Sequence, residues 1–331
     1  MPEPTPPQPA DAGYTGRHRA GPDATQVGPD GEGRHPIRDE QMSVWVTAQQ
    51  TGPVQRRGRY VPESVKHPAR MLPAIAAHAI HSYTQPGDLV FDPMAGIGTT
   101  IVEAIHAGRD GIGVEYEPRW SNIADANIAH ALRQGATGRG SVIRGDATRM
   151  TYLLPTALQG QVALVITSPP YGPAVHGLVT PGEGGVTKTD AAYGDDKGNL
   201  AYRSGGLAGL AAGFTDILRG VEQLLRPGGV AVITARPWRK KGELVDLPSA
   251  VIAAGVDAGL VPLERCIALL AAVRDDQFVA RPSFFQLAQV RKARASGVPM
   301  HLIAHEDVII LGKPDTSSEG GRHAAGPGVG R

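Results

Sequence analysis

The sequence predicts an α/β fold in which a doubly wound sheet of seven strands is covered by helices on both faces. Short runs rich in β-branched residues alternate along the chain with longer runs whose apolar residues recur at helical spacing. Several helical runs end on a glycine just before the next strand, where a helix commonly stops. Ligands of doubly wound sheets bind at the carboxyl ends of the strands, so the residues at those ends are the candidates for function.

The expected elements alternate from residue 71 to residue 311. Strands are expected over residues 88–93, 111–116, 141–146, 162–167, 229–235, 264–273 and 306–311. Helices are expected over residues 71–83, 99–108, 117–135 and 214–229. The last of these helical runs closes on Pro-Gly-Gly, which stops a helix before the next strand.

One folded domain, residues 43–313, is expected between two tails. The first 40 residues contain eight prolines and six glycines and almost no large apolar residue, so burial cannot offset the entropy of ordering them. Residues 1–42 and 314–331 are therefore expected to be disordered. Residues 172–206 contain nine glycines with no clear periodicity, and we expect a flexible loop there that becomes ordered around substrate.

Charge and cysteine content exclude several classes of protein. A formal net charge of +1 gives no field over the whole molecule that would attract a polyanion, so any nucleic-acid contact must come from local patches. The single cysteine, Cys266, excludes an intrachain disulfide and a zinc site built on several thiolates, and it suits a cytoplasmic location. No run of about 20 apolar residues is present, so the sequence predicts no membrane span.

The first strand end carries a glycine turn, FDPMAGIGTT, over residues 91–100. Gly96 and Gly98 are expected to let the backbone approach a ligand where a β-carbon would collide. The turn lacks the lysine of a phosphate-binding P-loop, and the third glycine of the dinucleotide fingerprint is absent near Ile101. A pyrophosphate is therefore not the favoured ligand.

The next two strand ends each carry an acidic residue. Glu115 lies about 20 residues after the glycine turn, where a carboxylate can accept hydrogen bonds from both ribose hydroxyls. Asp146 ends the following strand, where it can accept a hydrogen bond from an adenine amine. A single acid at a strand end is often structural, but this ordered series on adjacent strands favours a ligand that contains adenosine.

The fourth strand ends on a stiff corner, SPPYG, at residues 168–172. Pro169 and Pro170 have fixed φ and no N–H donor, which leaves carbonyl acceptors directed outward. The hydroxyl of Ser168 and the carbonyl of Pro169 can together accept both protons of an aromatic amine. The ring of Tyr171 can then stack on the base that carries this amine.

Taken together, DPMAGIGTT and TSPPYG resemble the corresponding motifs of the amino-methyltransferases that use S-adenosylmethionine, in particular the DNA N4-cytosine and N6-adenine group. HPARMLP (67–73), RPGGVAVITA (226–235) and HEDVIIL (305–311) are similar to further motifs of this group, and the resemblance covers most of residues 67–311. It implies a Rossmann-like class I methyltransferase fold whose last strand is antiparallel.

The resemblance also implies a role for each candidate residue. Ser168, Pro169, Pro170 and Tyr171 would hold the target base. S-adenosylmethionine would be bound by Asp92, Pro93, Ala95, Gly96, Gly98, Thr99, Thr100, Glu115 and Asp146. His67, in the motif before the glycine turn, is expected near the pocket.

The expected activity is methylation of the exocyclic amine of a DNA base, cytosine N4 or adenine N6. Serine in the first position of SPPY favours cytosine slightly. Methylation of cytosine C5 is excluded, because it needs a cysteine nucleophile and Cys266 follows Arg265 inside an expected strand. A duplex substrate would have its target nucleotide flipped out of the stack.

Three other functions stay open at this point. The enzymes that methylate guanine N2 in transfer RNA share the sheet and a similar Pro-Pro-Tyr corner, so RNA is an alternative substrate. A nucleic-acid-binding protein without turnover would leave SPPY unexplained, and so would a nicotinamide-dependent oxidoreductase. The oligomeric state also stays open.

Two basic segments are candidates for nucleic-acid contact, RPWRKK (236–241) and RPSFFQLAQVRKAR (281–294). Arg56, Arg57 and Arg59 are expected to contact phosphates or to face solvent. One of the two histidines His301 and His305 is expected to be a core or capping residue. The sequence shows no constellation of metal ligands.

Overall fold

The computed structural model describes residues 42–170, 174–182, 185–192, 199–202, 204–240, 243–282 and 284–314. Their central element is an eight-stranded sheet in the order β1-β11-β14-β8-β5-β2-β3-β4. These strands are β1 (Val44–Trp45), β2 (Leu89–Asp92), β3 (Asp110–Glu115), β4 (Gly140–Arg144), β5 (Val162–Thr167), β8 (Leu225–Ala235), β11 (Val261–Leu269) and β14 (His305–Gly312).

The strand order is that of the expected class I methyltransferase fold, with one strand added. β14 runs antiparallel to both of its neighbours, β8 and β11, and every other neighbouring pair in this sheet is parallel. The chain order reverses between β2 and β5, and doubly wound sheets bind their ligands in the crevice at such a switch point. The fold therefore directs attention to the carboxyl ends of β2 and β5.

The added strand, β1, pairs in parallel with β11 at the edge of the sheet. With only two residues it is too short to give a periodic sequence signal, which explains why the sequence predicted seven strands. Trp45 anchors this strand, because its side chain is buried and its ring stacks on that of His78 at a centroid distance of 4.3 Å.

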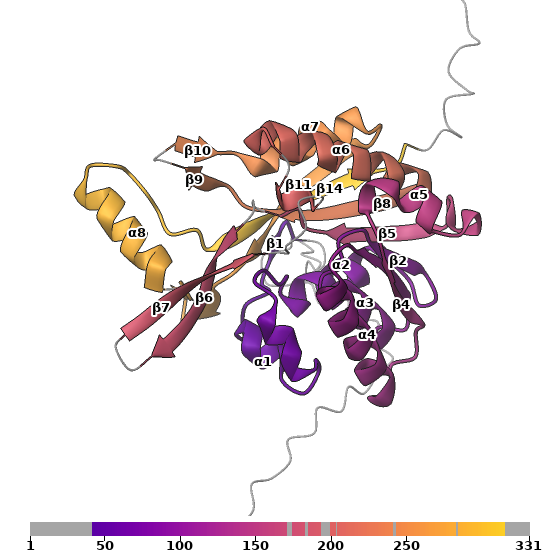
Figure 1. The fold of residues 1–331 in the computed structure, drawn as a ribbon, viewed down its shortest axis with the longest axis horizontal. Helices are drawn as coiled ribbons and strands as arrows, with labels where there is room; N and C mark the ends of the chain where they lie inside the picture. The colour runs from indigo at the N-terminus through magenta and orange to yellow at the C-terminus, as the bar shows by residue number, and fades with distance from the viewer. Residues whose placement is uncertain are drawn as a thin grey trace, which may run out of the picture. The chain divides into compact units, whose positions relative to one another are not determined.

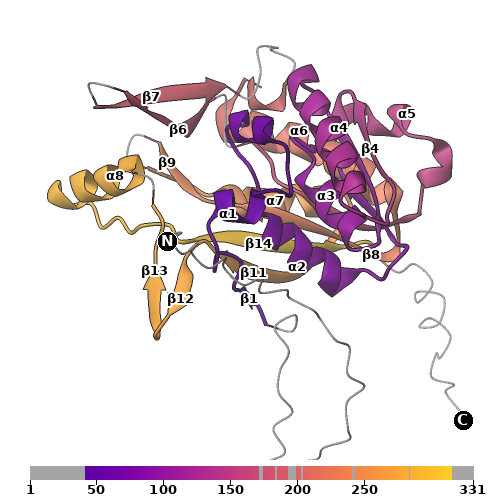
Figure 2. The same cartoon turned by 90° about the horizontal axis from the view of Figure 1, so that it is seen from below.

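Helices cover both faces of the sheet, whereas α8 (Phe284–Ala295) lies apart from it (Figures 1 and 2). The other helices of the described residues are α1 (Gly52–Arg56), α2 (Pro73–Tyr83), α3 (Thr99–His106), α4 (Pro118–Arg133), α5 (Met150–Leu153), α6 (Gly206–Leu224) and α7 (Leu247–Asp257). One core cluster joins α6 and α7 to the sheet face that carries Val165 and Ile233. A second joins α2 to the opposite face, where Ile166 and Val232 lie, and a third joins α3 to α4 through Ile101 and Ile128.

Three expected boundaries differ from the structure. Residues 172–206 were expected to lack regular structure, but β6 (Ala174–Gly182) and β7 (Gly185–Ala192) form an antiparallel pair there, and Leu200–Tyr202 forms a 3-10 turn. Thr180 pairs with Thr187 and Val179 with Lys188, a strand signal that the many glycines of this segment obscured. α6 starts at Gly206 and ends at Leu224, and β8 begins directly after it.

The third difference concerns the strand expected over 264–273, which ends at Leu269. Ala272–Arg274 forms a separate strand, β12, which pairs with β13 (Gln277–Val279). Asp275 and Asp276 between them both have positive φ, the conformation of a tight two-residue hairpin turn. The apolar run Leu-Leu-Ala-Ala-Val therefore spans two elements.

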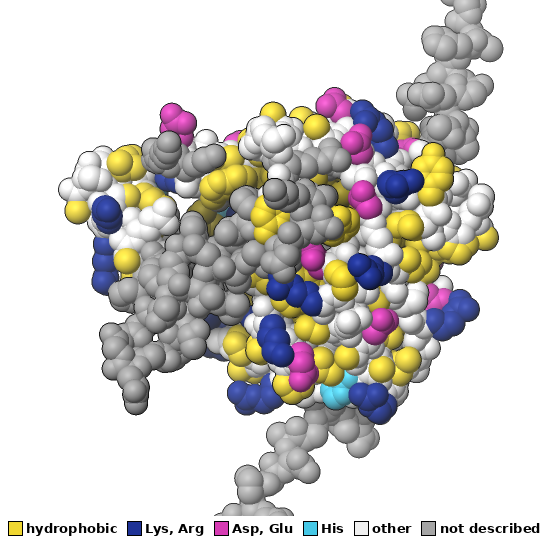
Figure 3. Space-filling model, viewed as in Figure 1, with side chains coloured by type: hydrophobic (Ala, Val, Ile, Leu, Met, Phe, Trp, Pro, Cys, Tyr) yellow, Lys and Arg dark blue, Asp and Glu magenta, His cyan; other side chains and the backbone are white. Residues whose placement is uncertain are grey.

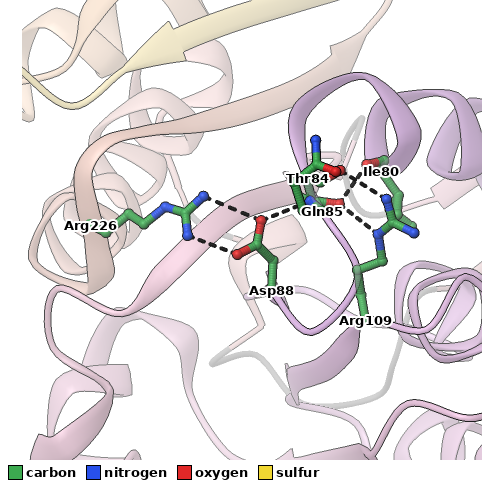
Figure 4. Close-up of polar contacts among 6 residues, drawn as sticks. All are labelled: Ile80, Thr84, Gln85, Asp88, Arg109 and Arg226. Carbon is green, nitrogen blue, oxygen red and sulfur yellow. Dashed lines mark hydrogen bonds and ion pairs between the residues drawn. The ribbon is translucent and has the colours of Figure 1, made fainter.

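Figure 4 shows the polar contacts that fix the turn before β2. Asp88 accepts hydrogen bonds from Arg226, at 2.8 and 3.3 Å, and from the amide of Gln85, at 2.8 Å. Burial raises the pKa of Asp88, but Arg226 and the Gln85 amide together bring it below its usual value. Arg109 donates to the hydroxyl and carbonyl of Thr84, which caps α2. These contacts hold the amino end of β2, opposite the switch point.

A buried carboxylate connects the segment before α2 to α3. Glu103 in α3 is buried and accepts hydrogen bonds from the hydroxyl of Tyr60 at 2.7 Å and from Nε of Arg59 at 2.8 Å. The ion pair between Arg59 and Glu103 holds the Arg59 side chain against α3, so this side chain is not fully exposed to solvent.

The first testable prediction concerns this carboxylate. Glu103→Gln should lower the free energy of unfolding by about 1.5 to 3 kcal/mol, because it weakens charged hydrogen bonds to two partners. Urea denaturation of both proteins measures this change. Arg139→Ala removes an ion pair with Asp110 from an exposed side chain and should leave the midpoint unchanged. Equal midpoints for wild type and Glu103→Gln would show that the buried network contributes nothing.

In the part of the chain that the structure describes, no helix has the length and apolarity to cross a lipid bilayer.

Candidate active site

A cavity lies at the switch point, where the carboxyl ends of β2, β3, β4 and β5 meet. It is lined by eleven of the thirteen residues that the sequence selected: Asp92, Pro93, Ala95, Gly96, Thr99, Thr100, Glu115, Asp146, Ser168, Pro169 and Pro170. Gly98 does not line the cavity, and Tyr171, with Gly172, lies outside the described residues. Four consecutive strand ends of the parallel sheet thus meet in one site.

Asp92 organises the glycine turn from inside. Its carboxylate is buried and accepts hydrogen bonds from the hydroxyl of Thr100 at 2.7 Å and from the amide of Met94 at 3.0 Å. Burial raises the pKa of Asp92 to about 6, although both hydrogen bonds act in the opposite direction. Asp92 therefore fixes the start of α3 relative to the end of β2.

Gly96 lies at the point where the turn meets the cavity. Its φ of +54° favours glycine, and an added Cβ would lie 3.2 Å from Nε2 of His67. The amide of Gly96 donates a 2.7 Å hydrogen bond to Glu115 Oε2. The turn, His67 and the acid at the end of β3 are therefore coupled through this one residue.

Gly98 lies at the interface of two helices, outside the residues that line the cavity. Its φ is +78°, and an added Cβ would lie 3.1 Å from the Cβ of Ala124 in α4, not in the cavity. Gly98 is the N-cap residue of α3. We conclude that the missing side chain of Gly98 lets α3 and α4 pack closely, and the expected contact of this residue with a ligand stays a prediction.

Glu115 presents an ordered carboxylate to the cavity. Oε2 accepts from the Gly96 amide, and Oε1 accepts from the Glu117 amide at 2.8 Å. Burial raises the pKa of Glu115 to about 7, and the nearby carboxylates of Asp92 and Glu117 raise it further, while the two amides lower it.

The raised pKa values of Asp92 and Glu115 carry a cost in stability. In the folded chain both groups bind protons more tightly than in the unfolded chain, so the protein loses stability as the pH rises from about 4 to about 7. Two buried acids with raised pKa values in one cavity are typical of a functional site. A ligand that donates hydrogen bonds to the ionised forms would offset the cost.

Asp146 follows β4 and is half-buried. Its Oδ1 accepts hydrogen bonds from the amide and the hydroxyl of Thr148, at 2.9 and 2.8 Å, and so caps a short 3-10 turn, Ala147–Arg149. Both Asp146 and Thr148 line the cavity.

Ser168, Pro169 and Pro170 directly follow β5, whose six residues are all buried. Pro169 is buried, whereas Ser168 and Pro170 are half-buried at the cavity wall. The stiff corner therefore lies in the same cavity as the glycine turn, on the neighbouring strand.

The cavity also contains residues that the sequence reasoning did not select as ligands. His67, which was expected near the pocket, lines it, and burial lowers its pKa to about 3, so the ring is neutral. Trp120 packs edge-on against His67 at a centroid distance of 4.6 Å. Glu117 accepts a 2.9 Å hydrogen bond from Asn199. The scarcity of aromatic residues was a signal that could have identified Trp120.

A second cavity adjoins the first and shares Ala69, Arg70, Met71 and Ser168 with it. Its wall also includes Arg57, Thr234, Arg236, Arg281 and Glu306. Of the three arginines that precede the HPARMLP motif, Arg57 is exposed there. Arg56 is buried and donates to the carbonyl of Met71, and burial lowers its pKa to about 10.

The basic segment 281–294 forms most of α8, where Arg291, Lys292 and Arg294 are exposed. Figure 3 shows Lys and Arg side chains on this helix at the left of the view. Cys266 is buried in β11, and burial raises its pKa to about 11, so it lacks the character of a nucleophile. Within the described residues no group of three or more His, Cys, Asp or Glu side chains could hold a metal ion.

Comparisons with known proteins find relatives over short stretches of this chain. The type II methyltransferase M.MthZI of Methanothermobacter thermautotrophicus is 36% identical over 59 residues, which are 18% of this chain and 17% of that protein. The type II methyltransferase M.BglI of Bacillus subtilis is 35% identical over 72 residues, 21% of each chain. The chain therefore matches only about a fifth of the length of these relatives.

Among solved structures, TrmN from Thermus thermophilus aligns with a TM-score of 0.46 at 16% identity, covering 78% of this chain and 53% of that chain. The family model described as DNA methylase, for the N6 and N4 enzymes, matches residues 24–126. Those residues include the glycine turn and Glu115. This part of the chain, under a third of its length, is thus similar to the N6/N4 DNA methylases.

Proposed function

We propose that this protein is an S-adenosylmethionine-dependent methyltransferase that methylates the exocyclic amine of a DNA base, cytosine N4 or adenine N6. One observation carries the proposal: the Ser168–Pro170 corner lines the same cavity as the glycine turn and the strand-end acids. The residues that would bind adenosine and the acceptors that would hold an aromatic amine thus line one cavity, as methyl transfer between two bound molecules requires.

The residues present fit S-adenosylmethionine. Glu115 offers a fixed carboxylate for the ribose hydroxyls, and Asp146 offers one for the adenine amine, while the absence of a side chain at Gly96 leaves the turn open. When bound, the cofactor supplies a methyl group on a positively charged sulfur. Glu115, ionised above a pH of about 7, and Asp92 supply negative charge on this side of the cavity.

The corner after β5 prepares the amine. An exocyclic amine is a poor nucleophile, because its lone pair is delocalised into the ring. Hydrogen bonds from its two protons to the Ser168 hydroxyl and the Pro169 carbonyl favour the tetrahedral nitrogen that develops during attack. Tyr171, the next residue, stacks on the base in this proposal and substitutes for the neighbouring bases of the duplex once the nucleotide has flipped out.

The phosphates of the nucleic acid meet local basic patches. The exposed Arg291, Lys292 and Arg294 of α8 and Arg57 at the second cavity are the candidates. Because each neutralised phosphate releases counterions, binding through these residues weakens steeply as salt rises.

The test supplies purified protein with methyl-labelled S-adenosylmethionine and separate pools of duplex DNA, single-stranded DNA and transfer RNA. We expect label in DNA, and mass spectrometry of the digested nucleosides identifies the base. Label confined to transfer RNA would establish the alternative, a guanine N2 methyltransferase. Binding of S-adenosylhomocysteine with no label in any polymer would refute an enzymatic role on nucleic acid.

The second prediction follows from the pKa of Glu115. A ribose hydroxyl donates best to the ionised carboxylate, so the affinity for S-adenosylhomocysteine should fall as the pH drops below about 7, by up to about tenfold per pH unit. Above that pH the affinity should be constant. Isothermal titration calorimetry between pH 6 and 8.5 measures the profile.

Glu115→Gln is the control for this profile. The amide does not titrate, so this variant should bind more weakly above pH 7 and lose most of the slope below it. Asp92 has a pKa of about 6, and a slope that persists in Glu115→Gln below that pH would belong to Asp92. A flat profile for the wild type would rule out the ionised Glu115 as the ribose ligand.

A further inference from the structure

Three polar side chains form a row across neighbouring strands beside the candidate active site. β14 is antiparallel, so its first residues reach the same sheet edge as the last residues of β5 and β8. Thr167 pairs with Ile233, which brings Ser168 next to Thr234, and Thr234 pairs with Val308. Glu306, two residues before Val308, lies on the same sheet face by the alternation of strand residues.

This row borders the second cavity. Ser168, Thr234 and Glu306 all line it, and Ser168 also lines the first. Neighbouring strands are about 5 Å apart, so the row extends from the amine-binding corner by about the width of one base. A base whose amine reaches Ser168 would therefore place the next atoms of its ring near Thr234 and Glu306.

Thr234 and Glu306 have polar atoms that lack a hydrogen-bond partner of good geometry. Thr234 is 1% exposed, and its hydroxyl meets no partner at ordinary hydrogen-bond geometry, although it interacts weakly with the Glu306 carboxyl. The side chain of Glu306 is 14% exposed, and its ion pair with Arg236 spans 3.7 Å, which is too long for a hydrogen bond. Buried polar atoms are normally satisfied, so this pattern points to a ligand that supplies the missing partners.

Burial and neighbouring groups shift the pKa of Glu306 in opposite directions. Burial raises its pKa above the usual value, while the neighbouring Arg236, Thr234 and His305 lower it. Arg70 and Arg281 line the same cavity, but both donate to backbone carbonyls, of His67 and Ala48 respectively. The net shift is upward, so Glu306 takes up a proton more readily than an exposed glutamate does, and the protonated carboxyl has one O–H donor.

We propose that Glu306, assisted by Thr234, binds the ring edge of the target base and donates a hydrogen bond to the ring nitrogen next to the methylated amine. The inference rests on the proposed function and assigns recognition of the base to a named residue. That nitrogen is an acceptor in cytosine (N3) and in adenine (N1). In guanine the carbon that carries the amine lies between N1, which has a hydrogen, and N3, which is an acceptor, so only one orientation of guanine would offer Glu306 an acceptor.

The experiment uses DNA oligonucleotides in which the methylated base is replaced by its deaza analogue, 3-deazacytosine or 1-deazaadenine, which lacks the ring acceptor. The wild type should show a kcat/KM at least tenfold lower on the analogue. Glu306→Ala should lose about tenfold on the natural base and show no further loss on the analogue. Glu306→Gln, whose amide can donate, should restore most of the activity on the natural base.

A matched control separates recognition from folding. Asp307→Asn removes the neighbouring buried carboxylate, which pairs with Arg265 at 2.7 Å and does not line either cavity. It should leave the ratio of natural to analogue kcat/KM as in the wild type. The affinity for S-adenosylhomocysteine should be unchanged in all three variants.

The outcomes distinguish this inference from the proposed function. If the wild type methylates DNA but Glu306→Ala discriminates between base and analogue as the wild type does, the inference is overturned and the proposed function stands. If Glu306→Gln is as impaired as Glu306→Ala, an ionised carboxylate is required and the donor role is wrong. If the wild type binds S-adenosylhomocysteine but methylates no DNA, both are overturned.

Discussion

Replacing Gly96 with valine should weaken the binding of S-adenosylhomocysteine by at least about 30-fold, equivalent to about 2 kcal/mol. A β-branched residue at a φ of +54° costs about 1 to 2 kcal/mol in backbone strain alone. The new side chain would also press on the His67 ring, whose Nε2 is 3.2 Å from the Cβ position. The turn can relax only by moving, which separates the Gly96 amide from Glu115 Oε2. Calorimetry on the folded variant measures the loss.

Gly98→Ala is the matched control, two residues away in the same turn. Its Cβ would meet Ala124 at 3.1 Å in the interface of α3 and α4. It should lower stability by about 1 to 2 kcal/mol, because of its left-handed φ, and leave the affinity for S-adenosylhomocysteine within about threefold. If Gly98→Ala weakens binding as much as Gly96→Val, the two glycines do not divide packing and ligand access as the structure indicates.

The arrangement of strands could be predicted from the sequence because the parallel strands are buried on both faces and form near-continuous apolar runs. β5, with all six residues buried, is such a strand. β1 could not be predicted, because two residues have no period, and its pairing with β11 is a long-range contact. The break of the run 264–273 depended on the left-handed Asp275 and Asp276, which only the folded chain reveals.

The candidate site could be predicted to the extent that its residues lie at the carboxyl ends of strands. Asp92, Glu115, Asp146 and Ser168 each lie at or just after such an end, and parallel strands bring these ends to one edge. Glu306 lies at the start of an antiparallel strand and reaches the same edge from the opposite chain direction. A search limited to the carboxyl ends of strands therefore misses Glu306.

Gly96 and Gly98 show a different limit of prediction from sequence. Both have positive φ, and sequence spacing cannot reveal which of them faces the cavity and which faces a helix. The direction of the missing Cβ decides that question, and it depends on how α3 packs against α4.

Ser168→Ala should lower kcat by roughly 10- to 100-fold and leave the affinity for S-adenosylhomocysteine within about twofold. The variant removes one acceptor for the amine protons in a cavity wall, and an unpaired polar group there costs about 1 to 3 kcal/mol. In the proposed function this hydrogen bond strengthens as the amine nitrogen becomes tetrahedral, so its loss affects turnover more than the KM for DNA. Steady-state kinetics with DNA, together with calorimetry, measure the two quantities.

Thr215→Ala provides the comparison, because it also deletes one hydroxyl, which donates to Ala211 within α6 and lines neither cavity. Its kcat should equal that of the wild type. A loss of S-adenosylhomocysteine affinity in Ser168→Ala equal to its loss of turnover would place the serine on the cofactor, and the corner after β5 would not be the amine-binding site. A kcat equal to that of the wild type would instead show that the amine requires only the backbone carbonyls at this corner as acceptors.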